Sequence, residues 1–406
     1  MNILKKIKPT KEEAEITTKL INLFLLELRN RIRGADISIG GSFAKGTWLK
    51  GNHDIDIFIK FDYNKYKSKD ISKIVENKIN NFKFKKLHGS RTYFQIFKNN
   101  LIFELVPVLK INNSSTILNV MDISPLHTEY IKHNTNLILR DEIRIAKAFF
   151  KANNLYGAET FQKGFSGYAI EVLTLHYKGF LNLLKATSKW QQSEVIDHEK
   201  HYNNKKEILL LLNKSKLISP LIVIDPVQKD RNITAVLSKK NYESFKILAR
   251  SYLKSKSEEY FTVKDQDINK LKGYIIVELL PKQEPRNVIG GKLARIIDYI
   301  KKHLELEQFS VIDYGSKWDN KFYIWYKIKQ ENLSSKIKHY GPSIDDTENL
   351  KKFKQRWNKT KIIKENNKVF VYTNRKFKKA IDLVKFLLND SSIAKVYSKS
   401  FVYQIK

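Results

Sequence analysis

The chain has 406 residues, 42% of them hydrophobic and 12% aromatic, so it can bury a core and intrinsic disorder is excluded. Lysine and arginine number 75 against 42 aspartates and glutamates, a formal net charge of +33, which indicates a polyanionic partner: nucleic acid or an anionic membrane surface. Because there is no cysteine, disulfides, zinc–thiolate sites, iron–sulfur clusters and cysteine nucleophiles are excluded, and a cytoplasmic location is favoured.

Neither a membrane span nor a signal peptide is expected. The longest apolar stretch, 20–28, is interrupted by Asn22 and Glu27 and is far shorter than the roughly 20 residues that a bilayer requires. The acidic segment 11–15 stands where the apolar part of a signal peptide would begin. At roughly 100 to 200 residues per domain, the length predicts two to four domains.

Helical and strand patterns alternate in residues 1–135, which predicts a mixed α+β domain. Thr10 and Glu13 form a capping box ahead of apolar residues at helical spacing. The expected elements are a helix at 11–32, a strand at 36–39, a glycine turn at 40–41, a short helix at 42–49, a strand at 54–61, a helix near 70–80, and strands at 93–97 and 101–109.

Two further domains are expected, at 136–255 and 256–406. The first is mainly helical, with helices at 141–152, 166–186 and 205–217. The second begins with a strand at 273–280, a helix at 288–306, and strands at 309–314 and 321–328, an order that predicts a ferredoxin-like unit. The remainder, 333–406, is a basic tail rich in aromatics, with one helix at 379–388.

Asp54 and Asp56 lie on one face of the expected strand 54–61, directly after a glycine-rich turn. Two neighbouring carboxylates repel each other, and a divalent cation such as magnesium would neutralise them. Glu104, the lone acid in the apolar strand 101–109, is the natural third ligand. Two magnesium ions held in this way could clamp both oxygens of a phosphoryl displacement. The alternative is that D-x-D marks a solvated strand face.

The turn at Gly40, Gly41 and Ser42 could bind a triphosphate through backbone N–H groups. A Gly-Ser turn, a D-x-D strand and an acid on a later strand, in that order, resemble the nucleotidyltransferase superfamily. More closely, the chain resembles the archaeal-type CCA-adding enzymes. The matching stretches are GGSFAKGTWLKGNHDIDIFI at 40–59, PLH at 125–127, LYGAE at 155–159, GFSGY at 164–168, and DPV with RN across 225–232.

The resemblance implies a palm-like nucleotidyltransferase domain at 1–135, a helical nucleotide-recognition domain at 136–255, and an RNA-binding ferredoxin- or RRM-like domain at 256–406. It implies metal binding by Asp54, Asp56 and Glu104, although the family's third acid is usually aspartate. The residues it assigns to the incoming nucleotide are Gly41, Ser42, Lys45, His127, Lys147, Tyr156, Arg231 and Asn232. Lys147 also stands out by itself, because it lies close to the apolar face of its helix.

The expected function is therefore template-independent addition of C, C and A to the 3′ end of tRNA from CTP and ATP, with release of pyrophosphate. The surplus of positive charge is expected to bind the tRNA. A poly(A) polymerase or an enzyme adding one nucleotide would share every catalytic residue. An RNA-binding protein with a silent transferase fold is the alternative outside the enzymes. The oligomeric state stays open, with a homodimer among the options.

Overall fold

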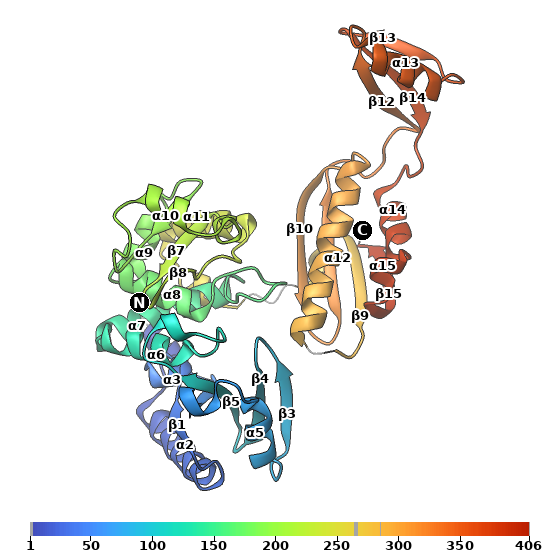
Figure 1. Ribbon diagram of the computed structural model, residues 1–406. Helices are drawn as coiled ribbons and strands as arrows, with labels where there is room; N and C mark the ends of the chain where they lie inside the picture. Colours follow the sequence, from blue (N-terminus) through green and yellow to red (C-terminus); the bar gives the residue numbers. More distant parts are fainter. Residues whose placement is uncertain (1–2, 264–266, 285, 406) are drawn as a thin grey trace. The chain divides into compact units, whose positions relative to one another are not determined.

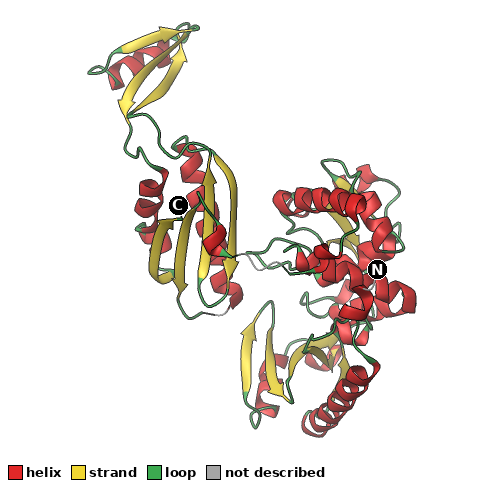
Figure 2. Ribbon diagram, turned by 180° about the vertical axis from the view of Figure 1, so that it is seen from behind, coloured by secondary structure: helices red, strands yellow, loops and turns green. Residues whose placement is uncertain are grey.

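A computed structural model describes residues 3–263, 267–284 and 286–405 of the chain (Figures 1 and 2). The chain divides into two compact units, Met1–Lys264 and Asp265–Lys406. In the part that is described, no helix is long and apolar enough to cross a membrane. The domain boundaries at 135/136 and 255/256 stay predictions.

The first unit starts with a five-stranded sheet in the order β1-β2-β5-β4-β3. Strands β2 and β5 are parallel neighbours, and the other pairs are antiparallel. The elements of this part are α1 (Ile3–Ile7), α2 (Lys11–Arg31), β1 (Ala35–Ile39), α3 (Gly41–Ala44), β2 (Asp54–Asp62), α4 (Tyr63–Tyr66), α5 (Ile71–Lys78), β3 (Phe84–His88), β4 (Thr92–Lys98) and β5 (Leu101–Lys110).

Alternation along β2 fixes which of its side chains enter the core. Ile55, Ile57 and Ile59 are buried against α2 and α5, as the period-two pattern predicts. Phe58 is also buried, against two valines of β5, so it separates the two aspartates at the start of this face from the polar residues at its end. The two aspartates therefore stand together at the start of the strand.

Helices dominate the rest of the first unit, with a small sheet in the order β6-β7-β8. The helix expected over 166–186 is two helices, because Gly179 adopts φ +136° and separates them. The helix expected over 205–217 ends earlier as well. The elements are α6 (Ser124–His133), α7 (Leu137–Ala152), α8 (Gly167–His176), α9 (Phe180–Thr187), β6 (Glu194–Ile196), α10 (Lys205–Leu211), β7 (Leu221–Asp225), β8 (Gln228–Asn232) and α11 (Lys239–Ser255).

The second unit contains an antiparallel sheet in the order β10-β11-β9-β15. With its two crossing helices this is the ferredoxin-like order that the sequence predicts. Helices α12 and α14 pack on one face of the sheet, which Figures 1 and 2 show from opposite sides. The elements are β9 (Ile275–Pro281), α12 (Arg286–Leu306), β10 (Val311–Trp318), β11 (Phe322–Ile328), α14 (Ala380–Leu388), α15 (Ser391–Ala394) and β15 (Tyr397–Gln404).

The segment expected to be a basic tail is folded. Part of it forms a three-stranded sheet with one helix, made of β12 (Lys336–Ser343), α13 (Thr347–Arg356), β13 (Ile362–Glu365) and β14 (Lys368–Asn374). The chain enters and leaves this inserted sheet at neighbouring points, since the Arg375 N–H donates to the Ser335 carbonyl at 2.8 Å. The last stretch then returns to β9 as the fourth strand of the ferredoxin-like sheet.

Candidate active site

The glycine turn brings α3 directly onto the carboxylate of Asp56. Gly41 adopts φ +58°, and a Cβ on it would lie 1.6 Å from Asp56 Oδ2. The Gly40 N–H donates to the Asp56 carbonyl at 2.8 Å. Only glycine permits both this conformation and this approach. The contact between the short helix α3 and the D-x-D strand β2 therefore depends on glycine at position 41.

The three predicted metal ligands lie on one face of the sheet, on its interior strands β2 and β5. Asp56 and Glu104 are register partners on the parallel strands β2 and β5, and Asp54 begins β2. Burial raises the pKa of Asp56, and Asp54 raises it further, while Lys45 opposes them. Burial also raises the pKa of Glu104 to about 7, with Asp56 adding to the effect. Carboxylates that resist ionisation next to one another are suited to a divalent cation, which removes their repulsion.

The three carboxylates do not lie close enough together to form a complete set of metal ligands. Among residues 3–263, 267–284 and 286–405, no three His, Asp or Glu side chains lie close enough together to hold a metal ion. Glu104 Oε1 instead accepts a hydrogen bond of 2.5 Å from Gln95 Nε2 on the neighbouring strand β4. The carboxyl-oxygen chemistry fits magnesium, and Glu104 would have to turn from Gln95 to complete the set.

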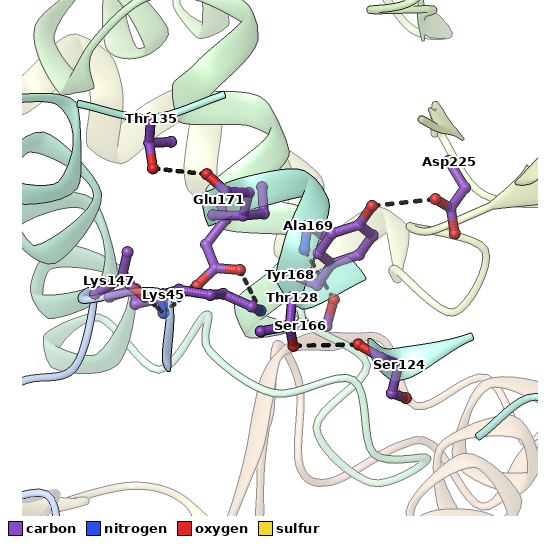
Figure 3. A network of polar contacts seen from close by, with 12 residues as sticks. Lys45, Ser124, Thr128, Thr135, Lys147, Ser166, Tyr168, Ala169, Glu171 and Asp225 are labelled. Atoms are coloured by element: carbon purple, nitrogen blue, oxygen red, sulfur yellow. Dashed lines mark hydrogen bonds and ion pairs between the residues drawn. The ribbon is translucent and has the colours of Figure 1, made fainter. Parts of the chain in front are cut away.

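A buried ionic network stands beside these acids (Figure 3). Lys45 Nζ lies 2.8 Å from Glu171 Oε2, and Lys147 Nζ lies 2.6 Å from Glu171 Oε1. Thr47 donates to Glu171 Oε1 at 2.8 Å and accepts from Lys147 at 2.9 Å. Burial alone would raise the pKa of Glu171, but Lys147 and Lys45 outweigh it and lower this pKa to about 2. The network thus holds an ionised carboxylate between two ammonium groups.

A second cluster surrounds Asp225, whose side chain is fully buried at the end of β7. His127 Nε2 lies 2.8 Å from Asp225 Oδ2, and the Tyr168 hydroxyl donates to Oδ1 at 3.1 Å. Arg231 Nη1 lies 3.5 Å from Asp225 Oδ2, with 36% of the Arg231 side chain exposed. Burial lowers the pKa of His127, and its hydrogen bond to Asp225 opposes this effect. Arg231 is the member of the cluster that a ligand can reach.

Helix α8 joins the two clusters. Tyr168, in its first turn, stacks on His127 with ring centroids 4.0 Å apart and an interplanar angle of 26°. The ammonium of Lys45 lies 5.6 Å from the Tyr168 ring centroid, and Glu171 follows one turn later on the same helix. Four of the predicted nucleotide ligands, Lys45, His127, Lys147 and Arg231, are thereby brought around α8.

The remaining predicted residues fall around this centre. Ser42 is the second residue of α3, and its carbonyl accepts from the Thr47 N–H at 2.9 Å. Tyr156 is half-buried, and its hydroxyl lies close to Gly167: a Cβ added to Gly167 would lie 2.6 Å from that hydroxyl. Asn232 is buried, and its amide group is bound to the backbone of Val223, Thr234 and Lys216. Asn232 therefore holds the β7–β8 hairpin together.

The sequence interpretation did not identify Glu171, Thr47 or Tyr168 as site residues. For Glu171 a signal was present, because it is the single acid in the apolar helix α8. The reasoning that selects Glu104, a lone acid on an apolar element, applies equally to Glu171. Thr47 and Tyr168 lie in the matching stretches 40–59 and 164–168, but their residue types do not single them out within those stretches.

Three family models match the chain. The nucleotidyltransferase domain matches residues 21–127, the second domain of tRNA nucleotidyltransferase matches 141–262, and the C-terminal domain of the CCA-adding enzyme matches 281–404. The acids on β2 and β5 lie in the first match, and the residues around α8 lie mostly in the second.

Curated relatives match over most of their length. A CCA-adding enzyme from Nanoarchaeum equitans is 39% identical over 393 residues, covering 94% of this chain and 97% of the relative. One from Saccharolobus shibatae is 31% identical, covering 85% and 82%, and one from Methanocaldococcus jannaschii is 31% identical, covering 95% and 89%.

Solved structures share the fold at low identity. Those of a cytoplasmic RNA terminal U-transferase and of the Cid1 poly(U) polymerase match with TM-scores of 0.51 and 0.52 at 13% and 14% identity. Each match covers 65% of this chain and 97% of the solved chain. The nucleotidyltransferase fold is thereby confirmed for the part that they cover.

Proposed function

The chain belongs to the CCA-adding enzymes, and from that premise we propose which residues bind the metal ions, the triphosphate and the base. The enzyme adds C, C and A to the 3′ end of tRNA without a template, using CTP and ATP. The match to the whole length of a CCA-adding enzyme carries this conclusion. A poly(A) polymerase, a single-nucleotide transferase and a silent RNA-binding protein are not favoured. We place the reaction in the cytoplasm and leave the oligomeric state open.

We propose that Asp54, Asp56 and Glu104 hold two magnesium ions. Bound there, the ions supply electrostatic stabilisation of the phosphates and of the ribose 3′-oxygen. The protein's own part is to fix the carboxylates: Gly41 seats Asp56, and Gln95 holds Glu104 until the ligand set closes. Glutamate instead of aspartate at this third position gives the longer reach that the hydrogen bond to Gln95 uses.

The triphosphate is proposed to lie between α3 and α7. Ser42 and the backbone of the glycine turn face it from one side, while Lys45 and Lys147 present their ammonium groups. Each ammonium carries three N–H donors; Lys147 donates to Thr47 and Glu171, and Lys45 donates to Glu171. Donors therefore remain to offset charge on the leaving pyrophosphate. His127 and Tyr156 border this region.

Arg231 is proposed to read the incoming base. Cytosine and adenine share an exocyclic amine beside a ring-nitrogen acceptor, to which a guanidinium can donate, whereas uracil and guanine present the reverse pattern. The amine cannot reach Asp225, because this side chain is fully buried and its oxygens contact His127, Tyr168 and the Val227 N–H. We therefore assign Asp225 to the orientation of Arg231, Asn232 to the support of the hairpin, and contact with the amine to a backbone carbonyl.

The reaction can be tested with a tRNA that lacks its 3′ end and with each nucleotide given singly and together. We expect two C additions with CTP, one further A with both nucleotides, and no long A tract. Asp56→Ala should abolish incorporation while tRNA binding is retained, because Asp56 is assigned to the metal and tRNA binding to basic side chains. Asp62→Asn, at the far end of the same strand, is the matched control. Incorporation by Asp56→Ala above a few per cent of wild type would contradict the assignment.

A further inference from the structure

Glu171 is a charged side chain in a place that disfavours charge. It is 1% exposed, on a helix whose neighbouring residues Ile170, Val172 and Leu173 are all fully buried. An ionised carboxylate persists in such surroundings only when cations pair with it. None of the reaction's assigned steps requires Glu171, so its presence calls for a role of its own.

The partners of Glu171 exceed what its own charge needs. One lysine would neutralise the carboxylate, yet its two oxygens are divided between Lys45 and Lys147, which are 7% and 4% exposed. Both ammonium groups also interact electrostatically with the buried carboxylate of Asp56, one of the proposed metal ligands. Glu171 therefore holds two cations next to the acids at which the phosphates are proposed to bind.

The two lysines come from different parts of the first unit. Lys45 caps the C-terminus of α3, a helix of only four residues, and Lys147 lies in the middle of α7. Both side chains are long and would otherwise sample many rotamers. Figure 3 shows both side chains meeting the carboxylate of Glu171. A single carboxylate thus sets the positions of both ammonium groups before any nucleotide arrives.

We propose that Glu171 is a positioning residue, which aims Lys45 and Lys147 at the triphosphate of CTP and ATP without touching the nucleotide. This inference rests on the proposed placement of the triphosphate between α3 and α7. Pre-ordering the two lysines removes an entropic cost that binding would otherwise carry. Because the triphosphate is common to both nucleotides, Glu171 should affect CTP and ATP equally and leave tRNA binding alone.

The test uses Glu171→Gln, which keeps the shape of the side chain but removes its charge and turns an N–H donor toward an ammonium. We expect kcat/KM for CTP and for ATP to fall by the same factor, about tenfold, as for loss of a charge-assisted hydrogen bond. Inhibition by pyrophosphate should weaken in parallel, and KM for tRNA should not change. Thr174→Val, one turn further along α8 and outside the network, is the control.

A double-mutant cycle with Lys147→Met separates positioning from a role in folding. Lys45 still pairs with Glu171 in this variant, and thermal unfolding checks that each protein is folded. If Glu171 acts through the lysines, Glu171→Gln should cost clearly less in the Lys147→Met background. Equal cost in both backgrounds, or a rise in KM for tRNA, would overturn the inference. Wild-type kcat/KM for CTP in Lys147→Met would instead overturn the proposed triphosphate site itself.

Discussion

Gly41→Ala tests whether activity requires the close approach of α3 to Asp56. An alanine Cβ would lie 1.6 Å from Asp56 Oδ2, where ordinary contact begins at 3.4 Å. The carboxylate or the turn must therefore move by about 2 Å, and a misplacement of about 1 Å at a reacting centre costs on the order of 100-fold. The left-handed φ of +58° adds about 1 kcal/mol of strain, or roughly 3 °C in the unfolding temperature.

Gly51→Ala provides the matched control, because Gly51 also has a left-handed φ, +72°, but nothing lies within 4 Å of an added Cβ. Thermal unfolding should show the loss from the left-handed φ in both variants, and a larger loss in Gly41→Ala because of the clash with Asp56. Only Gly41→Ala should lose activity, by at least about 100-fold in single-turnover incorporation of CMP. If Gly41→Ala stays within a few-fold of Gly51→Ala, Asp56 does not depend on the glycine turn and the reasoning is refuted.

Three further predictions concern stability, base choice and RNA binding. Although burial opposes it, Lys147 and Lys45 lower the pKa of Glu171 to about 2, so its carboxylate stabilises the fold above the unfolded pKa and this stability is lost as pH falls toward 2. The gap in unfolding temperature between wild type and Glu171→Gln should therefore be full at pH 6 and shrink below about pH 4.5; a constant gap would contradict the ion pairing. Arg231→Ala should raise kcat/KM for UTP relative to CTP about tenfold or more, at roughly 1 to 3 kcal/mol per unpaired group, and an equal drop for both would remove Arg231 from base recognition. Joining Ser335 to Arg375 across the inserted sheet removes ten Lys and Arg against four Asp and Glu, and should lower the salt dependence of tRNA binding. An unchanged slope would place the RNA contacts elsewhere.

Local patterns predicted the elements that depend on local residues. The helix at 11–32 and the strand at 54–61 agree with α2 and β2 to within a residue, because a capping box and strict alternation define them. The break at Gly179 was missed, since a single glycine inside an apolar periodic run is a weak signal. The pairing of β15 with β9 was missed for another reason. The periodicity of a strand does not indicate which distant strand it pairs with.

The candidate site shows the same difference between features that depend on local residues and contacts between distant segments. Asp54 and Asp56 were visible because their spacing places both on one strand face. The contact between Lys45 and Glu171 joins residues 126 positions apart, and no local pattern in either segment indicates it. Lys147 is buried, as its place near the apolar face of its helix indicates, but its partner Glu171 could be named only from the packing of α7 against α8.

The position of β15 has a consequence for how the protein is made. Strand β9 is central in its sheet, between β11 and β15, and it is nearly all apolar. During synthesis β9 leaves the ribosome early, and α12, β10, β11, the inserted sheet and α14 must all follow before β15 can pair with it. Until then one edge of β9 is unpaired, and an exposed apolar edge invites association with other chains. The nascent second unit is therefore a natural client for chaperones, and loss of a few residues from β15 should cause aggregation rather than a milder enzymatic defect.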